Sequence, residues 1–170
     1  VNPISEYGKA KVIASQEVKE LCKLNKIRFI HARILSVYGP CNELDTMIMS
    51  TIIRLLKGEE PEFTQGEQQW DYMYSDDAAE ALLLLAEKGK DGQIYCVGSG
   101  EVKALHDYIN IIGKVVNPKI PLGIGKVPYA PNQIMELYAD ISALQRDTGF
   151  QPAVSFEEGI QRTKEWIVEH

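Results

Sequence analysis

The sequence predicts an α/β fold with mainly parallel strands. Segments with apolar residues at helical spacing alternate with short segments rich in β-branched and aromatic residues, as in strands joined by crossover helices. The candidate strand at 27–35 (IRFIHARIL) is apolar along most of its length, which favours a strand covered on both faces of a parallel sheet. The chain has 170 residues, 45% of them hydrophobic and 25% charged, which suits one ordinary globular domain.

The helix boundaries follow from residues that satisfy free backbone groups or end a helix. Ser5 is expected to cap the first helix, and Ser155 with Glu158 forms a capping box for the last one. Gly58 and Gly89 are expected to end helices, where glycine is common. The expected helices are 5–23, 45–57, 75–88 with Ser75 or Asp76 as its cap, 103–116, 140–149 with Asp140 as its cap, and 155–170.

The expected strands occupy the stretches between these helices. The strand at 27–35 leads to the turn residues 38–40 (YGP), because glycine and proline interrupt regular structure. Further strands are expected at 69–74 and 93–97, and residues 120–127 are expected to be extended. The acidic residues after the second helix are interpreted as a solvated turn; they are Glu59, Glu60 and Glu62.

Charge and cysteine content narrow the classes of partner. The net charge is −6, which argues against nucleic acid, because binding phosphates requires a basic face. No apolar run approaches the ~20 residues of a membrane span, and no signal-peptide pattern is present. We therefore expect a cytoplasmic protein with no membrane partner, and the unpaired Cys22, Cys41 and Cys96 fit a reducing compartment. The histidines lack metal-ligand spacing, and we expect no metal site.

A tyrosine and a lysine one helical turn apart are the candidate catalytic residues. Tyr7 and Lys11 share one face of the first expected helix, with Cβ atoms about 5–6 Å apart. A lysine ammonium about 6 Å from a phenol oxygen favours the phenolate by about 2–3 kcal/mol at an effective dielectric constant of about 20. Such a tyrosine can exchange a proton with a sugar hydroxyl while a hydride moves to or from a nicotinamide. The same spacing also arises by chance in solvated helices.

Several segments, taken in order, resemble one enzyme family. Residues 3–11 (PISEYGKAK) resemble the P-x-S-x-Y-G-x-[SA]-K segment of the extended short-chain dehydrogenases/reductases, the nucleotide-sugar epimerase/dehydratase family. The likeness continues in register through the chain, which makes it far more specific than any one motif. The other segments are 33–40 (RILSVYGP), 69–81 (QWDYMYSDDAAEA), 93–100 (QIYCVGSG), 140–152 and 156–160 (FEEGI).

This resemblance implies the C-terminal part of a doubly wound Rossmann-type parallel sheet, plus the small mixed α/β substrate-binding domain. Residues 1–40 would be a remnant of the dinucleotide-binding domain. Residues 41–170 would be mainly the substrate-binding part, with 69–97 returning a strand and a helix to the Rossmann sheet. The full-length protein would be an NAD(P)-dependent epimerase, dehydratase or ketoreductase acting on a nucleotide-activated sugar. The 170-residue chain alone would be inactive.

The resemblance also implies roles for individual residues. Tyr7 would be the proton-exchanging acid/base, and Lys11 would hydrogen-bond the nicotinamide ribose and favour the phenolate. Ile34 and Leu35 would approach the nicotinamide and its carboxamide through backbone groups. The residues expected to contact the nucleotide sugar are Ser36, Leu44, Met47, Phe63 and Trp70.

Several positions depart from the family pattern. Ser36 stands where the family usually has an asparagine, and a hydroxyl has fewer donors and a shorter reach. Trp70 stands where many members have an arginine that grips the pyrophosphate, and Ala130 stands at a second such position. Trp70 would either stack on a base or sugar or belong to the core. The diphosphate would be bound through other groups, for example Lys119 or Lys126, or the substrate is not an ordinary nucleotide sugar.

The sequence contains no cofactor pyrophosphate motif. None of the thirteen glycines forms G-x-x-G-x-x-G or G-x-G-x-x-G, so most of the NAD or NADP site is expected to precede residue 1. An alternative is a family-derived binding or interaction module that does not catalyse. The strand near 27–34 would normally lie beside strands of the missing half. Its free edge is therefore expected to pair with another strand, as in a homodimer.

Overall fold

The computed structural model of the chain describes residue 3 and residues 5–170. This part has the predicted α/β character, with six helices between short strands. The side chains of Ser5 and Ser155 each accept a hydrogen bond from a backbone N–H at the start of the following helix, as predicted. The helices are α1 (Glu6–Leu24), α2 (Met47–Leu56), α3 (Ser75–Lys88), α4 (Leu105–Val116), α5 (Ser142–Thr148) and α6 (Phe156–Glu169). The predicted cap of α5 is wrong: its N-cap is Ile141, although the Asp140 carboxylate accepts a 3.0 Å hydrogen bond from the backbone N–H of Ser142.

The strands are shorter than the sequence predicts. The strand expected at 27–35 forms only over its second half, and residues 36–38 form another strand directly after it. The strand expected at 69–74 is interrupted at Asp71, and most of 120–127 is not strand. The strands are β1 (His31–Ile34), β2 (Ser36–Tyr38), β3 (Glu62–Phe63), β4 (Gln69–Trp70), β5 (Tyr72–Tyr74), β6 (Ile94–Val97), β7 (Lys103–Ala104), β8 (Gly123–Ile124) and β9 (Glu136–Leu137).

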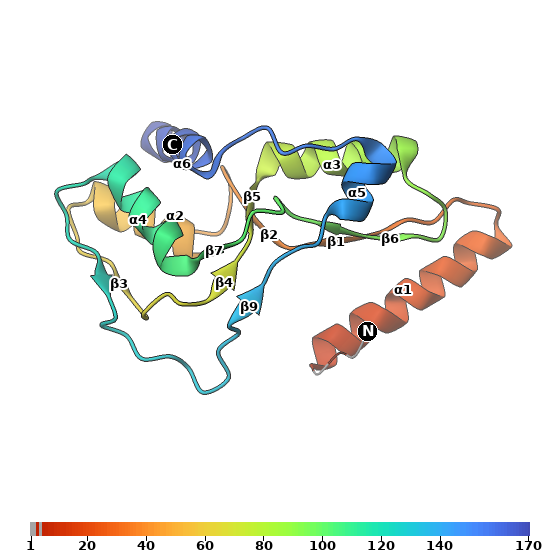
Figure 1. Cartoon of the computed structure of the whole chain (residues 1–170), viewed down its shortest axis with the longest axis horizontal. Coiled ribbons are helices and arrows are strands. Elements are labelled where there is room, and N and C mark those ends of the chain that lie inside the picture. Colours follow the sequence, from red (N-terminus) through yellow and green to blue (C-terminus); the bar gives the residue numbers. More distant parts are fainter. Residues whose placement is uncertain (1–2, 4) are drawn as a thin grey trace.

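Most strand pairs are parallel. β1 pairs with β6, with His31 opposite Ile94, and β2 pairs with β5, with Ser36 opposite Tyr72. β3 pairs with β8 in parallel, and β4 lies between an antiparallel β7 and a parallel β9. The chain passes from the β1–β6 pair to the β2–β5 pair within two residues. The end of β1 therefore connects the part of the molecule that contains α3 and α5 with the part that contains α2, α4 and α6 (Figure 1).

Two clusters of buried side chains hold the elements together. One packs α2, α4 and α6 around β2 and β5, with Ile52 and Ile160 fully buried. The other packs α3 and α5 on β1 and β6, with Leu144 and Val97 fully buried. Full burial of one such side chain contributes about 1.5–3 kcal/mol, so these two clusters set the positions of the strands.

Helix α1 differs from the other helices. It lies across β1 and β6 on the side opposite α3 and α5 (Figure 1), and none of its described residues is buried. Several of its apolar residues face solvent, and Leu24 is 81% exposed. Helices in folded proteins gain most of their stability from burying an apolar face. The free side of α1, beside a strand that pairs only with β6 in the described residues, is thus a surface that further polypeptide could cover.

A buried carboxylate at the break between β4 and β5 ties three segments together. Asp71 is fully buried, and its Oδ1 accepts hydrogen bonds from the backbone N–H and the hydroxyl of Ser99 at 2.8 and 2.6 Å. Its Oδ2 accepts from the N–H groups of Gly100 at 3.0 Å and Ala139 at 3.4 Å. A β-carbon on Gly98 would lie 2.6 Å from this Oδ2, so only glycine allows the close approach.

The predicted cap of α3 is wrong. The helix begins at Ser75, so neither Ser75 nor Asp76 is its N-cap, and the side chain of Tyr74 makes no capping bond. Asp77, in the first turn, is buried. Its two carboxylate oxygens accept hydrogen bonds at 3.0 Å from the backbone N–H groups of residues 153 and 154. Asp77 thus anchors the segment before α6.

We expect Asp71→Asn to lower the free energy of unfolding by about 3 kcal/mol, because an amide group would turn a donor toward buried N–H donors. Asp76→Asn is the control. The Asp76 side chain is 67% exposed, and its loss should change stability by less than about 0.5 kcal/mol. Denaturant unfolding of both variants measures the difference, and equal losses would rule out an anchoring role for Asp71.

Candidate active site

A cavity of about 730 Å³ lies between α1 and β1. Tyr7 and Lys11 line it from the first turns of the helix. Ile34 lines it from the carboxyl end of β1, and Ile94 lines it from β6. In parallel α/β sheets, ligands bind beyond the carboxyl ends of the strands. The structure therefore gathers Tyr7, Lys11 and Ile34, three of the predicted cofactor-binding residues, around one hollow.

The two candidate catalytic residues contact each other. Ser5 caps α1 through a 3.0 Å hydrogen bond from the third residue after it, which places Tyr7 in the first turn. Tyr7 is 73% exposed, and the ammonium nitrogen of Lys11 lies 5.3 Å from the centre of the Tyr7 ring. This distance is within the range of a cation–π contact. The pair can thus present a phenol hydroxyl beside a cation to a ligand in the cavity.

Polar residues that were not predicted to be functional also line this cavity: Ser15, Gln16, His31 and Arg33. The hydroxyl of Ser15 and Nδ1 of His31 form a hydrogen bond between α1 and β1. Burial lowers the pKa of His31, and the nearby Arg33 guanidinium lowers it further, so the imidazole is neutral at pH 7. Alternation along one strand could have identified His31 and Arg33, because residues i and i+2 share a face.

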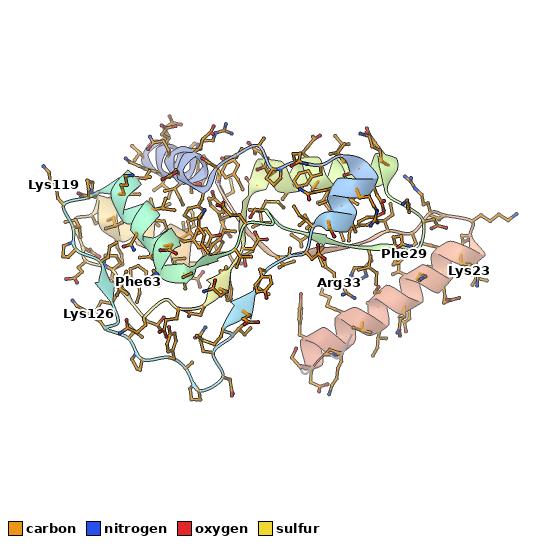
Figure 2. All side chains as sticks on the ribbon, viewed as in Figure 1. Lys23, Phe29, Arg33, Phe63, Lys119 and Lys126 are labelled. Atoms are coloured by element: carbon orange, nitrogen blue, oxygen red, sulfur yellow. The ribbon has the colours of Figure 1, made fainter. Side chains whose placement is uncertain are left out.

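The cavity is positively charged. Lys11 and Arg33 are cations on its wall, and no acidic residue lines it within the described part of the chain. Figure 2 shows Arg33 on the side of β1 that faces α1. Cations on the wall of a hollow attract anionic or electron-rich groups. The arrangement thus suits a ligand with phosphate, carboxylate or many hydroxyl oxygens.

The other predicted site residues lie outside this cavity. The backbone N–H of Leu35 donates to the carbonyl of Val97 at 3.0 Å, and its side chain packs against the α3–α5 cluster. Leu44 is exposed before α2, and Met47 packs against the α2–α4–α6 cluster. Phe63 is on β3, far along the molecule from Arg33 in Figure 2. The backbone N–H of Leu35 is therefore already used within the fold.

The two unusual residues, Ser36 and Trp70, contact each other. Nε1 of Trp70 donates a hydrogen bond to the hydroxyl oxygen of Ser36 at 2.8 Å. The indole is half-buried and packs against the α2–α4–α6 cluster, with its ring 6.4 Å from that of Tyr72. A serine is short enough to leave room for the indole, and its oxygen takes the indole proton. The two departures from the family pattern thus form a single contact.

The lysines considered as phosphate ligands lie at the far edge of the molecule (Figure 2). The ammonium of Lys126 lies 2.6 Å from Oε1 of Glu60 and 3.8 Å from Oε1 of Glu62. The hydrogen bond to Glu60 raises the pKa of Lys126. Glu60 and Glu62 are thus more than the solvated turn that was predicted, because they neutralise Lys126. Lys119 is exposed in the loop after α4, and Ala130 is also exposed.

Residue 3 and residues 5–170 contain no group of three or more His, Cys, Asp or Glu side chains placed to hold a metal ion. None of the helices described there combines the length and the apolar character that crossing a membrane requires. Cys22, Cys41 and Cys96 are free thiols.

Known sugar-nucleotide enzymes are similar to this chain. A dTDP-glucose 4,6-dehydratase of Salmonella typhimurium is 26% identical, over 98% of this chain and 48% of its own length. The structure of a Thermotoga maritima UDP-glucose 4-epimerase with UDP-glucose matches with a TM-score of 0.88 at 26% identity, covering 99% of this chain and 55% of that one. A Methanobrevibacter ruminantium UDP-N-acetylglucosamine 4-epimerase, in complex with UDP-N-acetylmuramic acid, gives a TM-score of 0.87 at 26% identity over the same shares.

These similarities confirm the predicted Rossmann-type α/β fold. The chain spans about half the length of the relatives that it matches. The model of the family described as "NAD dependent epimerase/dehydratase family" matches residues 1–98, which is more than half of the 170 residues. The matched range contains Tyr7, Lys11, β1 and Asp71. The chain therefore belongs to the NAD-dependent epimerase/dehydratase family.

Proposed function

We propose that this chain supplies the catalytic tyrosine and the substrate side of an NAD(P)-dependent epimerase, dehydratase or ketoreductase acting on a nucleotide-activated sugar. The observation that carries the proposal is the placement of Tyr7 and Lys11, one turn apart, on the wall of one cavity. Relatives named as a dTDP-glucose dehydratase and as UDP-sugar epimerases support this class of substrate.

Each of these residues would have its own role in the reaction. A bound nicotinamide would supply the hydride acceptor or donor. Tyr7 would take a proton from a sugar hydroxyl or return it, and its exposure leaves the phenol oxygen accessible. Lys11 would stabilise the phenolate and donate hydrogen bonds to ribose hydroxyls. The apolar side chain of Ile34 would exclude water from the nicotinamide ring.

The cavity fits the nicotinamide end of a dinucleotide better than its pyrophosphate. Besides the cations of Lys11 and Arg33 it offers a phenol and apolar side chains, whereas dinucleotide pyrophosphate sites use a glycine-rich turn at a helix N-terminus. The rest of the cofactor would thus be held by polypeptide outside these 170 residues. That polypeptide, or a second copy in a homodimer, would also cover the free edge of β1 and the exposed apolar side of α1.

A non-catalytic binding module is the second candidate. The observation that favours it is that none of the thirteen glycines forms the pyrophosphate motif. A glycine-rich turn upstream in the parent gene, with a Ser or Thr about two dozen residues before Tyr7, would support the enzyme. A parent gene without these features would support the module.

In the full-length protein we expect Tyr7→Phe to lower kcat by at least ~100-fold, because the general acid/base is lost. Tyr138→Phe is the matched control, since Tyr138 is also exposed but does not line the cavity. Turnover of dTDP-glucose and UDP-glucose by both variants measures the effect. Parental turnover by Tyr7→Phe would show that another group carries the proton.

For the 170-residue chain alone we expect the Tyr7 cavity to have little or no affinity for NAD, because it would contact only the nicotinamide end. Isothermal titration calorimetry with NAD and with NADP tests this expectation. Micromolar binding of NAD that is tighter than the binding of ADP would overturn it and would mean that these residues hold a complete cofactor site.

The Trp70–Ser36 hydrogen bond is expected to hold the indole beside the end of β1. Trp70→Phe and Ser36→Ala each remove one end of it, and a double-mutant cycle should give a coupling free energy of about 1 kcal/mol. Trp166→Phe combined with Ser36→Ala is the control, because Trp166 is on α6, and its effect should be additive. Denaturant unfolding measures both cycles. Additive losses in the Trp70 cycle would mean that the hydrogen bond contributes nothing.

A further inference from the structure

A second cavity, of about 490 Å³, lies at the other end of α1. It is formed by the last turns of the helix, the segment that leads into β1, and the turn before β6. Figure 2 shows Lys23 and Phe29 in this region. Lys23 is 16 residues beyond Tyr7, which corresponds to about 24 Å along a helix. The two cavities share no lining residue.

This second cavity carries a local excess of positive charge. Four of its lining residues are basic and one is acidic, although the whole chain has a net charge of −6. The acidic residue, Asp91, is already used, because its Oδ1 accepts a 2.8 Å hydrogen bond from the backbone N–H of Phe29. The basic residues are Lys19, Lys23, Lys26 and Arg28.

The four basic residues differ in their other contacts. The guanidinium of Arg28 donates to the carbonyl oxygens of Glu87 and Gly89, both at 3.3 Å, and so holds the end of α3. The ammonium of Lys19 is 3.5 Å from the carbonyl oxygen of Gly92, at the limit of a hydrogen bond. Lys23 and Lys26 are exposed, which leaves their ammonium groups free to reach a ligand.

Lys26 holds a left-handed backbone conformation that favours glycine and, less strongly, asparagine. Its φ is 57°, at the second position after the last residue of α1, where a left-handed residue closes the helix. The backbone N–H of Ile27 completes the closure by donating to the carbonyl of Cys22 at 2.8 Å. At the same position after α2 the chain has Gly58, with a φ of 78°. A strained residue in a cavity points to a function for its side chain.

The helix dipole does not account for this arrangement. Lysines near a helix C-terminus are favoured by its partial negative charge, and that effect alone can explain Lys23. The partial charge is only about half an elementary charge, so several lysines leave the cavity positive. The dipole gives no reason for a lysine at the strained position of Lys26, because glycine would close the helix at lower cost.

The remaining lining residues indicate the kind of ligand. Phe29 is half-buried and Ile27 is exposed on the cavity wall. Small-molecule sites measure roughly 300–1,000 Å³ and combine apolar walls with a few polar groups. We propose that this cavity binds a small phosphate-bearing molecule, such as a nucleoside diphosphate, with Lys19, Lys23 and Lys26 around the phosphates. The site is independent of the chemistry at Tyr7.

Titration calorimetry of the chain with inorganic pyrophosphate, ADP and adenosine tests the ligand class. Pyrophosphate and ADP should bind, and adenosine should not, with affinities that fall as salt is added because the charges are screened. If ADP binds more tightly and Phe29→Ala removes that advantage, the ligand is a nucleotide; equal affinities indicate recognition of phosphates alone. Adenosine binding as tightly as ADP, or no binding of pyrophosphate at millimolar concentration, would overturn the proposal.

Lys26→Gly separates binding from folding. Glycine removes one ammonium group and relieves the left-handed backbone, so Tm should rise by about 2–4 °C, while pyrophosphate should bind at least ~5-fold more weakly. Lys23→Gln should also weaken binding. Lys57→Gln is the matched control, since Lys57 is likewise exposed at the end of a helix but lines neither cavity. Parental affinity in both Lys26→Gly and Lys23→Gln, or an equal loss in Lys57→Gln, would contradict the assignment.

Discussion

The buried carboxylate of Asp71 is the interaction on which the relative placement of the strands depends. The carboxylate accepts hydrogen bonds from the backbone N–H groups of Ser99 and Gly100, in the turn after β6, and of Ala139, after β9. Asp71 itself lies between β4 and β5. β6 in turn pairs in parallel with β1 over four residues of each strand. The end of β1, which forms the wall of the larger cavity, is thus positioned by a charge that no solvent reaches. Apolar packing could not fix these backbones in the same way, because it has no direction.

The sequence predicted the helices well because their signals are local. Ser5 and Ser155 cap helices through atoms three residues away, and the Tyr7–Lys11 pair also lies within one turn. The break at Asp71 could not be predicted, because the partners of this carboxylate are 28 to 68 residues distant. The Ser36–Trp70 contact spans 34 residues, so the sequence does not reveal that these two departures from the family pattern form one contact.

The cap of α3 shows how a local pattern can mislead. Ser75, Asp76 and Asp77 all suit the start of a helix, and sequence alone cannot tell a cap from a first-turn residue that reaches elsewhere. Asp77 bonds with backbone groups some 76 residues away, so tertiary contact decided its role. Likewise, the sequence shows His31 and Arg33 only as strand residues, and the position of α1 across the same face makes them part of the cavity wall.

The hydrogen bond between Ser15 and His31 attaches α1 to β1 near the middle of the helix. Ser15 is eight residues from Tyr7, or about 12 Å along a helix, so a tilt of about 2–3° around this point displaces the tyrosine by about 0.5 Å. Proton transfer is sensitive to shifts of that size. Lys23 is also eight residues from Ser15, so the same tilt moves the two ends of α1 by equal amounts in opposite directions.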